Sequence, residues 1–339
     1  MTNELPLRIE LLGGRIVVDP YELLGRSRAT DQDVAVLSGT LLEGFGNFYS
    51  DLDLYVIGEE LPDKGPDTPA RLLIREDGCV RRINETLEDP ANILLDIQYY
   101  TFSELDTLAR SLRTLYQESR QSTQIYRKTL HHEDEDLIHK LLSGRVLQDG
   151  TGEFDAHRTF DLGMFCFLKY RNEVGGYAEF RDLVGSWTAG DLDTCIYNTR
   201  GYLISQVSGM MFLAGSTNPR PKWFVRRLAA LPAEYADIKE GVMSWMEGPH
   251  RTKLEKRKAV ASACDLIDVT YKHSRALLGT NPKYFSAKEA LDLTEREFEG
   301  HATHDNDTIA EWHLRRQMFS HASPPLMMEI DNPSCRLQM

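Results

Sequence analysis

Two carboxylates at alternate positions are the strongest chemical signal in this chain. Asp51 and Asp53 open the segment DLDLYVIG (51–58), a short run with β-branched and aromatic residues that predicts a β-strand. Side chains alternate along a strand, so both carboxylates project from the same face. Carboxylates held a few ångströms apart repel each other unless a cation lies between them, and their hard oxygen atoms suit Mg²⁺ better than zinc. We therefore expect a magnesium site here.

Groups that suit a phosphate lie just before these acids. The predicted strand AVLSG (35–39) ends in the turn Gly39-Thr40, which offers a small residue, backbone N–H groups and a hydroxyl that can approach a triphosphate closely. Ser50, one residue before the first carboxylate, adds a second hydroxyl. We expect Gly39, Thr40 and Ser50 to line a nucleotide-binding site.

A third acid, Asp96, lies inside the apolar run NILLDIQYY (92–100), which also predicts a strand. An acid in such a run needs a partner. If this strand lies beside segment 51–58, the three carboxylates form a site for two metal ions, which can activate an attacking hydroxyl and neutralise a leaving pyrophosphate. Alone, the two neighbouring acids suit a solvated strand face, and Asp96 suits a helix cap or an arginine partner. Their order together with the glycine turn favours the metal site.

The elements that must position these residues fall into three parts. Residues 1–106 hold the predicted strands, with a short helix at 20–26 and a loop at 58–70 that is rich in proline and glycine. Residues 107–280 read as an all-helical domain, and residues 281–339 as a C-terminal extension. The fold class is therefore α+β, with a small mixed β-sheet domain and flanking helices, followed by a helical bundle.

The helical parts are read from polar–apolar periodicity and from terminal signals such as acids in a first turn. The expected helices span 103–130, 133–144, 157–173, 190–214, 234–246, 252–278, 286–298 and 307–320. The final segment, ASPPLMMEIDNPSCRLQM, is expected to be irregular.

The charge is unevenly distributed along the chain. The 339 residues carry 39 Lys+Arg and 52 Asp+Glu, a net charge of −13, and residues 1–106 account for −12 of it. Affinity for nucleic acid rests largely on Lys and Arg, so a long DNA or RNA partner is disfavoured. An acidic amino-terminal part suits divalent cations or a positively charged small molecule.

The cysteines and the hydropathy pattern bear on the cellular location. Five scattered cysteines without a CxxC pair argue for a reducing compartment, and against a disulfide framework or a thiolate zinc site. No window approaches 18 consecutive apolar residues, and the first residues lack a basic segment before an apolar one. We expect a cytoplasmic protein that does not interact with a membrane. The sequence leaves its oligomeric state open.

The segment SGTLLEGFGNFYSDLDLYVIG, with a later carboxylate on a strand, resembles the pattern of the DNA polymerase β-like nucleotidyltransferase superfamily, with Thr40 in place of the usual serine. Members of that family use Mg²⁺ to transfer a nucleoside monophosphate from an NTP to a hydroxyl. The resemblance implies that residues 1–106 are the catalytic domain and that Asp51 and Asp53 are metal ligands. It makes Asp96 the third carboxylate, as a metal ligand or as the general base for the acceptor hydroxyl.

A second resemblance lies in the helical part. The segment TRGYLISQVSGMMFLAGSTNPRPKWFVRRLAALPAEY is similar to the carboxy-terminal domain of streptomycin/spectinomycin-type aminoglycoside adenylyltransferases. Arg200 and Lys222 fall on that family's arginine and lysine positions, and the family's lysine reaches the triphosphate. The resemblance therefore implies that both residues bind the nucleotide, in a chain whose helical domain binds the substrate.

These observations lead to one main hypothesis and two others. The main one is a Mg²⁺-dependent enzyme that moves AMP from ATP to a hydroxyl of a small molecule, such as an antibiotic or a natural-product intermediate. The acidic amino-terminal part suits a cationic acceptor of this kind. A second is a nucleotidyltransferase that modifies a protein or a tRNA, the tRNA form of which needs a basic surface. The third is a catalytically silent nucleotide-binding regulatory protein.

Overall fold

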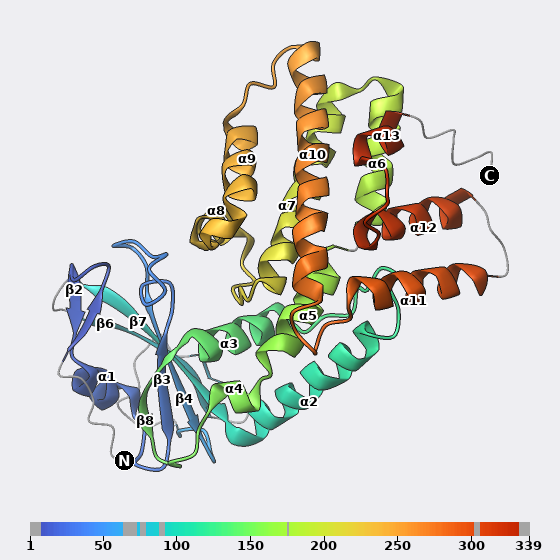
Figure 1. Ribbon diagram of the computed structural model, residues 1–339. Helices are drawn as coiled ribbons and strands as arrows, with labels where there is room; N and C mark the ends of the chain where they lie inside the picture. Colours follow the sequence, from blue (N-terminus) through green and yellow to red (C-terminus); the bar gives the residue numbers. More distant parts are fainter. Residues whose placement is uncertain are drawn as a thin grey trace. The chain divides into compact units, whose positions relative to one another are not determined.

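A six-stranded mixed sheet carries the predicted acids near its centre. The computed structural model describes residues 8–63, 73–74, 79–87, 92–174, 176–301 and 306–331. In spatial order the strands are β5 (Leu73–Ile74), β6 (Val80–Leu87), β7 (Ile93–Thr101), β4 (Leu52–Gly58), β3 (Val34–Ser38) and β8 (Arg145–Asp149). All of them except β5 are labelled in Figure 1. β4 and β7 run parallel, and the other neighbouring strands are antiparallel. β3 and β4 are buried along their whole length, which explains why both read as continuous apolar runs.

The chain divides into two units, and the first of them is not continuous in sequence. One unit contains residues 1–112 and 130–161, and the other contains residues 113–129 and 162–339. Residues 130–161 return to the sheet because β8 pairs antiparallel with β3. They also contribute α3 (His132–Ser143) and α4 (Ala156–Thr159). This grouping differs from the boundary expected at residue 106, since the polar strand β8 gave no apolar signal in the sequence.

A small hairpin precedes the main sheet. β1 (Ile9–Leu11) and β2 (Ile16–Val18) pair antiparallel, and their apolar side chains join the core of the sheet unit. α1 (Pro20–Ser27) follows, and the Asp19 carboxylate accepts a hydrogen bond from Tyr21 N at 2.8 Å. This cap together with proline in the first turn explains why the helix starts there.

The second unit is entirely helical in its described residues. α10 (Lys253–Leu278) packs against α7 (Leu192–Leu213) and α9 (Ala236–Glu247) around one apolar core (Figure 1). The other elements of this unit are α5 (Leu162–Glu173), α6 (Tyr177–Ala189), η1 (Pro221–Trp223), α8 (Phe224–Ala230), η2 (Ala233–Tyr235), α11 (Ala287–Glu299), α12 (Asn306–Phe319) and α13 (Leu326–Asp331). The α+β fold class expected from the sequence is confirmed.

Some expected boundaries were wrong. The helix expected at 103–130 is α2 (Phe102–Ser119), which ends at Ser119. The buried Arg171 guanidinium donates hydrogen bonds to the Ser119 carbonyl and to two carbonyls of the segment that follows. The helix expected at 157–173 is broken between α4 and α5, and the tail expected to be irregular contains α13. The sequence analysis also did not find α6, β1, β2, β5, β6 and β8. Residues 64–70 of the predicted loop at 58–70, and Cys335, lie outside the described residues.

The C-terminal residues are part of the helical unit and not a separate body. Arg315 of α12 is buried and donates to the Thr123 hydroxyl and the Glu297 carboxylate. Thr123 lies in the segment after α2, so this network ties three distant parts of the sequence together. Burial lowers the pKa of Arg315 to about 10, which still leaves its guanidinium charged at neutral pH.

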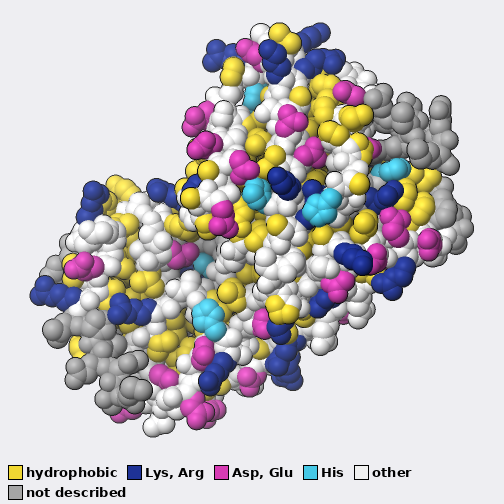
Figure 2. All heavy atoms as spheres, viewed as in Figure 1, with side chains coloured by type: hydrophobic (Ala, Val, Ile, Leu, Met, Phe, Trp, Pro, Cys, Tyr) yellow, Lys and Arg dark blue, Asp and Glu magenta, His cyan; other side chains and the backbone are white. Residues whose placement is uncertain are grey.

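The surface in view is mixed in charge. On the face drawn in Figure 2, Lys and Arg side chains of the described residues are interspersed with Asp and Glu. Among the described helices, none is both long enough and apolar enough to cross a bilayer. The cysteines within the described residues carry free thiols.

A half-buried ion pair links the sheet to α2 and gives one pH prediction. Arg81 of β6 donates to both Glu104 oxygens, and Thr101 N donates to the same carboxylate at 2.8 Å. Burial alone would raise the pKa of Glu104, but these hydrogen bonds lower it to about 2. The pair therefore stabilises the fold above pH 4.5, and this contribution is lost as the pH falls toward 2.

Glu104→Gln should therefore lower the free energy of unfolding more at pH 6.5 than at pH 3. Because the carboxylate is 36% exposed, we expect a difference of about 1 kcal/mol at pH 6.5. Urea unfolding at both pH values measures it, with Asp106→Asn, which changes an exposed acid of the same helix, as the control. A loss in the Gln variant that grows as the pH falls would contradict the prediction.

Candidate active site

The strand register brings the three predicted acids together. In the parallel pair of β4 and β7, Asp53 lies directly opposite Asp96. Asp51 is two residues before Asp53, so its side chain emerges on the same face. Each of the three offers a carboxylate oxygen, and these oxygens all lie within 4.8 Å of one another. The convergence expected from the sequence is present, and the donor set suits a hard divalent cation.

A buried lysine contacts Asp53, the acid of β4. Lys140 of α3 donates from Nζ to Asp53 Oδ2 at 2.5 Å, and the two residues are only 7% and 8% exposed. Burial raises the pKa of Asp53 while Lys140 lowers it, and the charges of Asp51 and Asp96 raise it further. The ammonium therefore offsets part of the repulsion among the carboxylates.

An arginine binds Asp96, the acid of β7. Arg82 of β6 donates from Nε to Asp96 Oδ1 and from Nη2 to Oδ2, each at 2.5 Å. Gln98 Nε2 adds a third hydrogen bond to Oδ2 at 3.0 Å. Asp96 is 1% exposed, and this bidentate contact explains how an acid is stable inside an apolar strand. The arginine partner considered for Asp96 from the sequence and the carboxylate cluster are therefore both present.

Asp51 differs from the other two acids. It is partly exposed, and it has no hydrogen bond or ion pair to any residue in the described part of the chain. Its neighbours in the cluster are carboxylates, so its charge is the least compensated of the three. A ligand with positive charge would bind most readily on this side of the cluster.

The glycine turn lies directly against the acids. Ser38, the last residue of β3, pairs with Asp53, and Gly39 follows with φ +108°. A Cβ at Gly39 would collide with Asp53 Oδ2. Within the described residues the Thr40 hydroxyl forms no hydrogen bond, while its carbonyl accepts from Gly46 N at 2.7 Å. Gly39 and Thr40 therefore lie beside the acids with a hydroxyl that remains open to a ligand.

Ser50 has a structural partner. Its hydroxyl oxygen accepts a hydrogen bond from Asn47 N at 3.0 Å, while Ser50 N donates to Asn47 O at 2.9 Å. The side chain thus closes a short turn before Asp51. Its hydroxyl proton is still available as a donor, and its expected contact with a phosphate stays a prediction.

Gly39→Ala is expected to lower kcat/KM for a reaction catalysed at this acid cluster by about 10²-fold, because displacing a carboxylate by about 1 Å costs catalysis on that scale. Gly152→Ala is the matched control, since Gly152 belongs to the same unit and also has a positive φ, of +70°, but nothing within 4 Å of an added Cβ. Steady-state kinetics of both variants test this. Equal losses would show that backbone strain, and not the collision with Asp53, is responsible.

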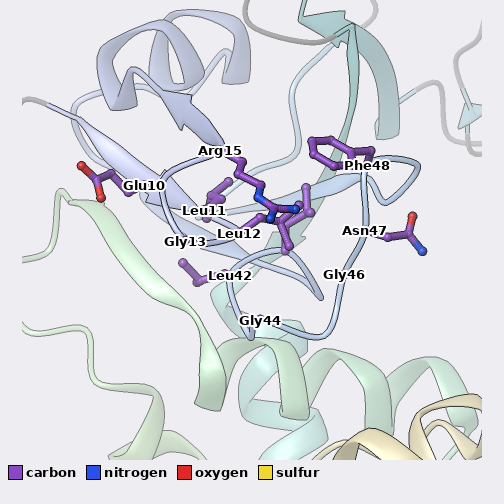
Figure 3. A pocket seen from close by; sticks show the side chains of 11 residues that line it. Glu10, Leu11, Leu12, Gly13, Arg15, Leu42, Gly44, Gly46, Asn47 and Phe48 are labelled. Atoms are coloured by element: carbon purple, nitrogen blue, oxygen red, sulfur yellow. The ribbon is translucent and has the colours of Figure 1, made fainter.

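A cavity of about 500 Å³ opens on the loop that joins this turn to Asp51. Hairpin residues 10–13 and 15 and loop residues 41, 42, 44 and 46–48 line it, and Figure 3 shows the Arg15 side chain extending from the hairpin toward the loop. Leu12, with φ +50°, and the exposed Phe48 supply apolar surface. The loop is anchored at its centre by Glu43, whose carboxylate contacts the buried His139 of α3 at 3.2 Å. The cavity combines apolar surface with the charged side chains of Arg15 and Glu10.

The two predicted cations of the helical unit are exposed. Arg200 lies on α7, and Lys222 lies in η1 with its ammonium 5.1 Å from the centre of the Trp223 ring. This contact is the ordinary arrangement of a helix-start lysine beside a tryptophan. The expected binding of the triphosphate by both residues stays a prediction.

Sequence analysis missed the two cations that hold the acids. Arg82 belongs to β6, whose sequence VRRINETL has too few apolar residues at alternate positions to predict a strand. Lys140 lies in a helix that was expected at 133–144. Its position inside the apolar stretch LIHKLL was the available signal, because an unpaired lysine is rarely buried.

Comparisons with known proteins add little to this geometry. No protein-family model matches the chain, and no curated protein matches it. Among solved structures, a nucleotidyltransferase-like protein from Exiguobacterium sibiricum is similar over 80% of this chain and 81% of its own length, with 11% identity and a TM-score of 0.35. The function of the site is therefore inferred from its residues.

Proposed function

We propose that this chain transfers a nucleoside monophosphate, AMP from ATP, to a hydroxyl of a small molecule and releases pyrophosphate. The observation that carries the proposal is the register that places Asp53 opposite Asp96, with the Asp51 carboxylate within 4.8 Å and Gly39 against the cluster. The sequence pattern around these residues, with its resemblance to polymerase β-like nucleotidyltransferases, gives the reaction class.

The residues fit a divalent ion in the way this reaction needs. Asp51 and Asp53 would hold the ion together with Asp96, since all three offer hard oxygen donors on one face of the sheet. When bound, Mg²⁺ would lower the pKa of the acceptor hydroxyl and neutralise charge on the pyrophosphate. Asp51 is the most accessible of the three ligands, because it alone lacks a cationic partner in the described residues.

The transfer is a substitution at phosphorus. The acceptor oxygen forms a bond to the α-phosphorus, and the bond from that phosphorus to the bridging oxygen of the pyrophosphate breaks. Asp96 already accepts three hydrogen bonds from Arg82 and Gln98. Both Asp96 oxygens are therefore already occupied by donors, so we assign the acceptor proton to water. We also propose that the Thr40 hydroxyl and the Gly39 turn bind phosphate oxygens, because Gly39 lies against Asp53 and the Thr40 hydroxyl forms no hydrogen bond within the described residues.

The loop cavity is our candidate for the rest of the donor or for the acceptor. Leu41 and Leu42, which directly follow the proposed phosphate turn, line the cavity, so it adjoins that turn. Its leucines and Phe48 suit a planar ring, Arg15 suits a nearby anionic group, and Glu10 suits a cationic one. Arg200 and Lys222 remain proposed phosphate ligands. Mg²⁺, a cationic acceptor and a cytoplasmic location are also proposals.

A thermal-shift screen with the four NTPs, each with and without Mg²⁺, tests donor binding first. A ligand that binds only the folded chain raises its Tm by mass action, so ATP with Mg²⁺ should give the largest shift. Pyrophosphate release on candidate acceptors, with labelled ATP in a lysate, then identifies the acceptor class. Label in the macromolecular fraction would favour modification of a protein or a tRNA over a small acceptor.

A further inference from the structure

We propose that this site takes one divalent ion in place of the two expected from the sequence, with the Lys140 ammonium acting as the second cation. The inference rests on the proposed function, because it concerns how the same carboxylates are neutralised. It makes Lys140 a positioning residue for Asp53, and it sets the number of metal ions in the enzyme.

The charge balance of the cluster already includes two cations of the protein. The three carboxylates contribute −3, while Lys140 and Arg82 contribute +2 through contacts of 2.5 Å to Asp53 and Asp96. The remaining charge of −1 is that of Asp51. One divalent ion reverses this charge to +1 before the polyanionic nucleotide binds, and a second would raise it to +3. The protein's own cations therefore already supply charge that a second ion would bring.

Displacing Lys140 from Asp53 costs free energy. A second ion between Asp53 and Asp96 would compete with Lys140 for an oxygen of Asp53. Within the described part of the chain, the Lys140 ammonium has no carboxylate partner other than Asp53, and its side chain is 9% exposed. Leaving this ammonium buried without a partner is costly, so the ion pair opposes a second ion.

The helix that carries Lys140, α3, is anchored to its neighbours. The Ser38 hydroxyl donates to the Lys140 carbonyl at 2.8 Å, and the preceding His139 contacts Glu43 at 3.2 Å. Ser38 in turn pairs with Asp53 in the sheet. The part of α3 that carries Lys140 is therefore held against β3 and against the loop, in a position from which the ammonium contacts Asp53.

The test counts Mn²⁺ in the full-length protein with α,β-methylene-ATP, an analogue that cannot release pyrophosphate. Equilibrium dialysis should give one Mn²⁺ per chain, and electron paramagnetic resonance should show an isolated ion. Two-metal sites hold their ions about 4 Å apart, so two ions would give a spin-coupled spectrum. A coupled pair in the unmodified protein overturns the inference and leaves the proposed function standing. No Mn²⁺ above the level of Asp53→Asn overturns both.

Lys140→Met and Lys140→Arg separate charge from packing. The Met variant removes the ammonium, so a second Mn²⁺ should bind and the coupled spectrum should appear, whereas the Arg variant keeps the charge and should retain one ion. Lys128→Met, which removes another paired lysine 2.8 Å from Glu118, is the control and should also retain one ion. A Met variant that folds and still binds a single isolated ion would overturn the role of Lys140. If it does not fold, the count in the unmodified protein still decides.

Discussion

Asp53→Asn is expected to slow Mg²⁺-dependent pyrophosphate release by roughly 10³-fold or more, the largest effect we anticipate on activity. Asn has nearly the same shape as Asp, but it removes the negative charge at the centre of the cluster. The lost charge weakens binding of the ion, and it leaves Lys140 facing a neutral amide at the position of Asp53 Oδ2. Pyrophosphate release with saturating ATP and Mg²⁺ measures the effect.

The matched control for this variant is Asp31→Asn, which changes an exposed acid of the same unit and should retain full activity. Circular dichroism and thermal unfolding confirm that both variants are folded. An unchanged rate in the Asp53 variant would favour the catalytically silent nucleotide-binding protein over the enzyme.

Arg315→Met is expected to lower the free energy of unfolding by about 3 kcal/mol, because removing one partner of a buried ion pair leaves the other charge uncompensated. The orphaned group is Glu297, whose carboxylate also accepts from the Thr123 hydroxyl at 3.0 Å. Urea unfolding followed by circular dichroism gives the difference, with the slope on urea showing whether the transition remains the same.

Arg316→Met provides the comparison for this prediction. Arg316 is the next residue in the same helix and pairs with Glu295 at 3.0 Å, but it is 41% exposed, so its loss should cost less than about 1 kcal/mol. A second check is the double variant Arg315→Met, Glu297→Leu, which removes both charges and should recover most of the lost stability. Similar losses in the two single variants would show that the burial of Arg315 is not what stabilises this region.

The sequence predicted the part of the site that depends on local patterns. The apolar runs around Asp53 and Asp96 were strong enough to identify both strands, and alternation along a strand placed Asp51 on the correct face. The sequence did not predict that these two strands are neighbours, and the metal site was expected only if they were. The structure meets this condition through a parallel register, which is set by the whole sheet and not by either strand alone.

The features that could not be predicted from the sequence depend on contacts between distant segments. Arg82 reaches Asp96 only because β6 lies beside β7, and the polar sequence of β6 conceals that strand. Lys140 is 87 positions away from Asp53, so no local pattern could pair them. The helix boundary at Ser119 likewise depends on the buried Arg171, whose guanidinium binds the Ser122 and Gln124 carbonyls.

The return of residues 130–161 to the sheet has a consequence for synthesis of the chain. When residue 112 has just left the ribosome, β3 lacks its neighbour β8 and Asp53 lacks the lysine that balances it. An uncovered strand edge and an uncompensated buried acid both disfavour a completed native sheet at that stage. A nascent chain that stalls before α3 emerges should therefore be sensitive to proteases, and one stalled after residue 161 has emerged should be resistant.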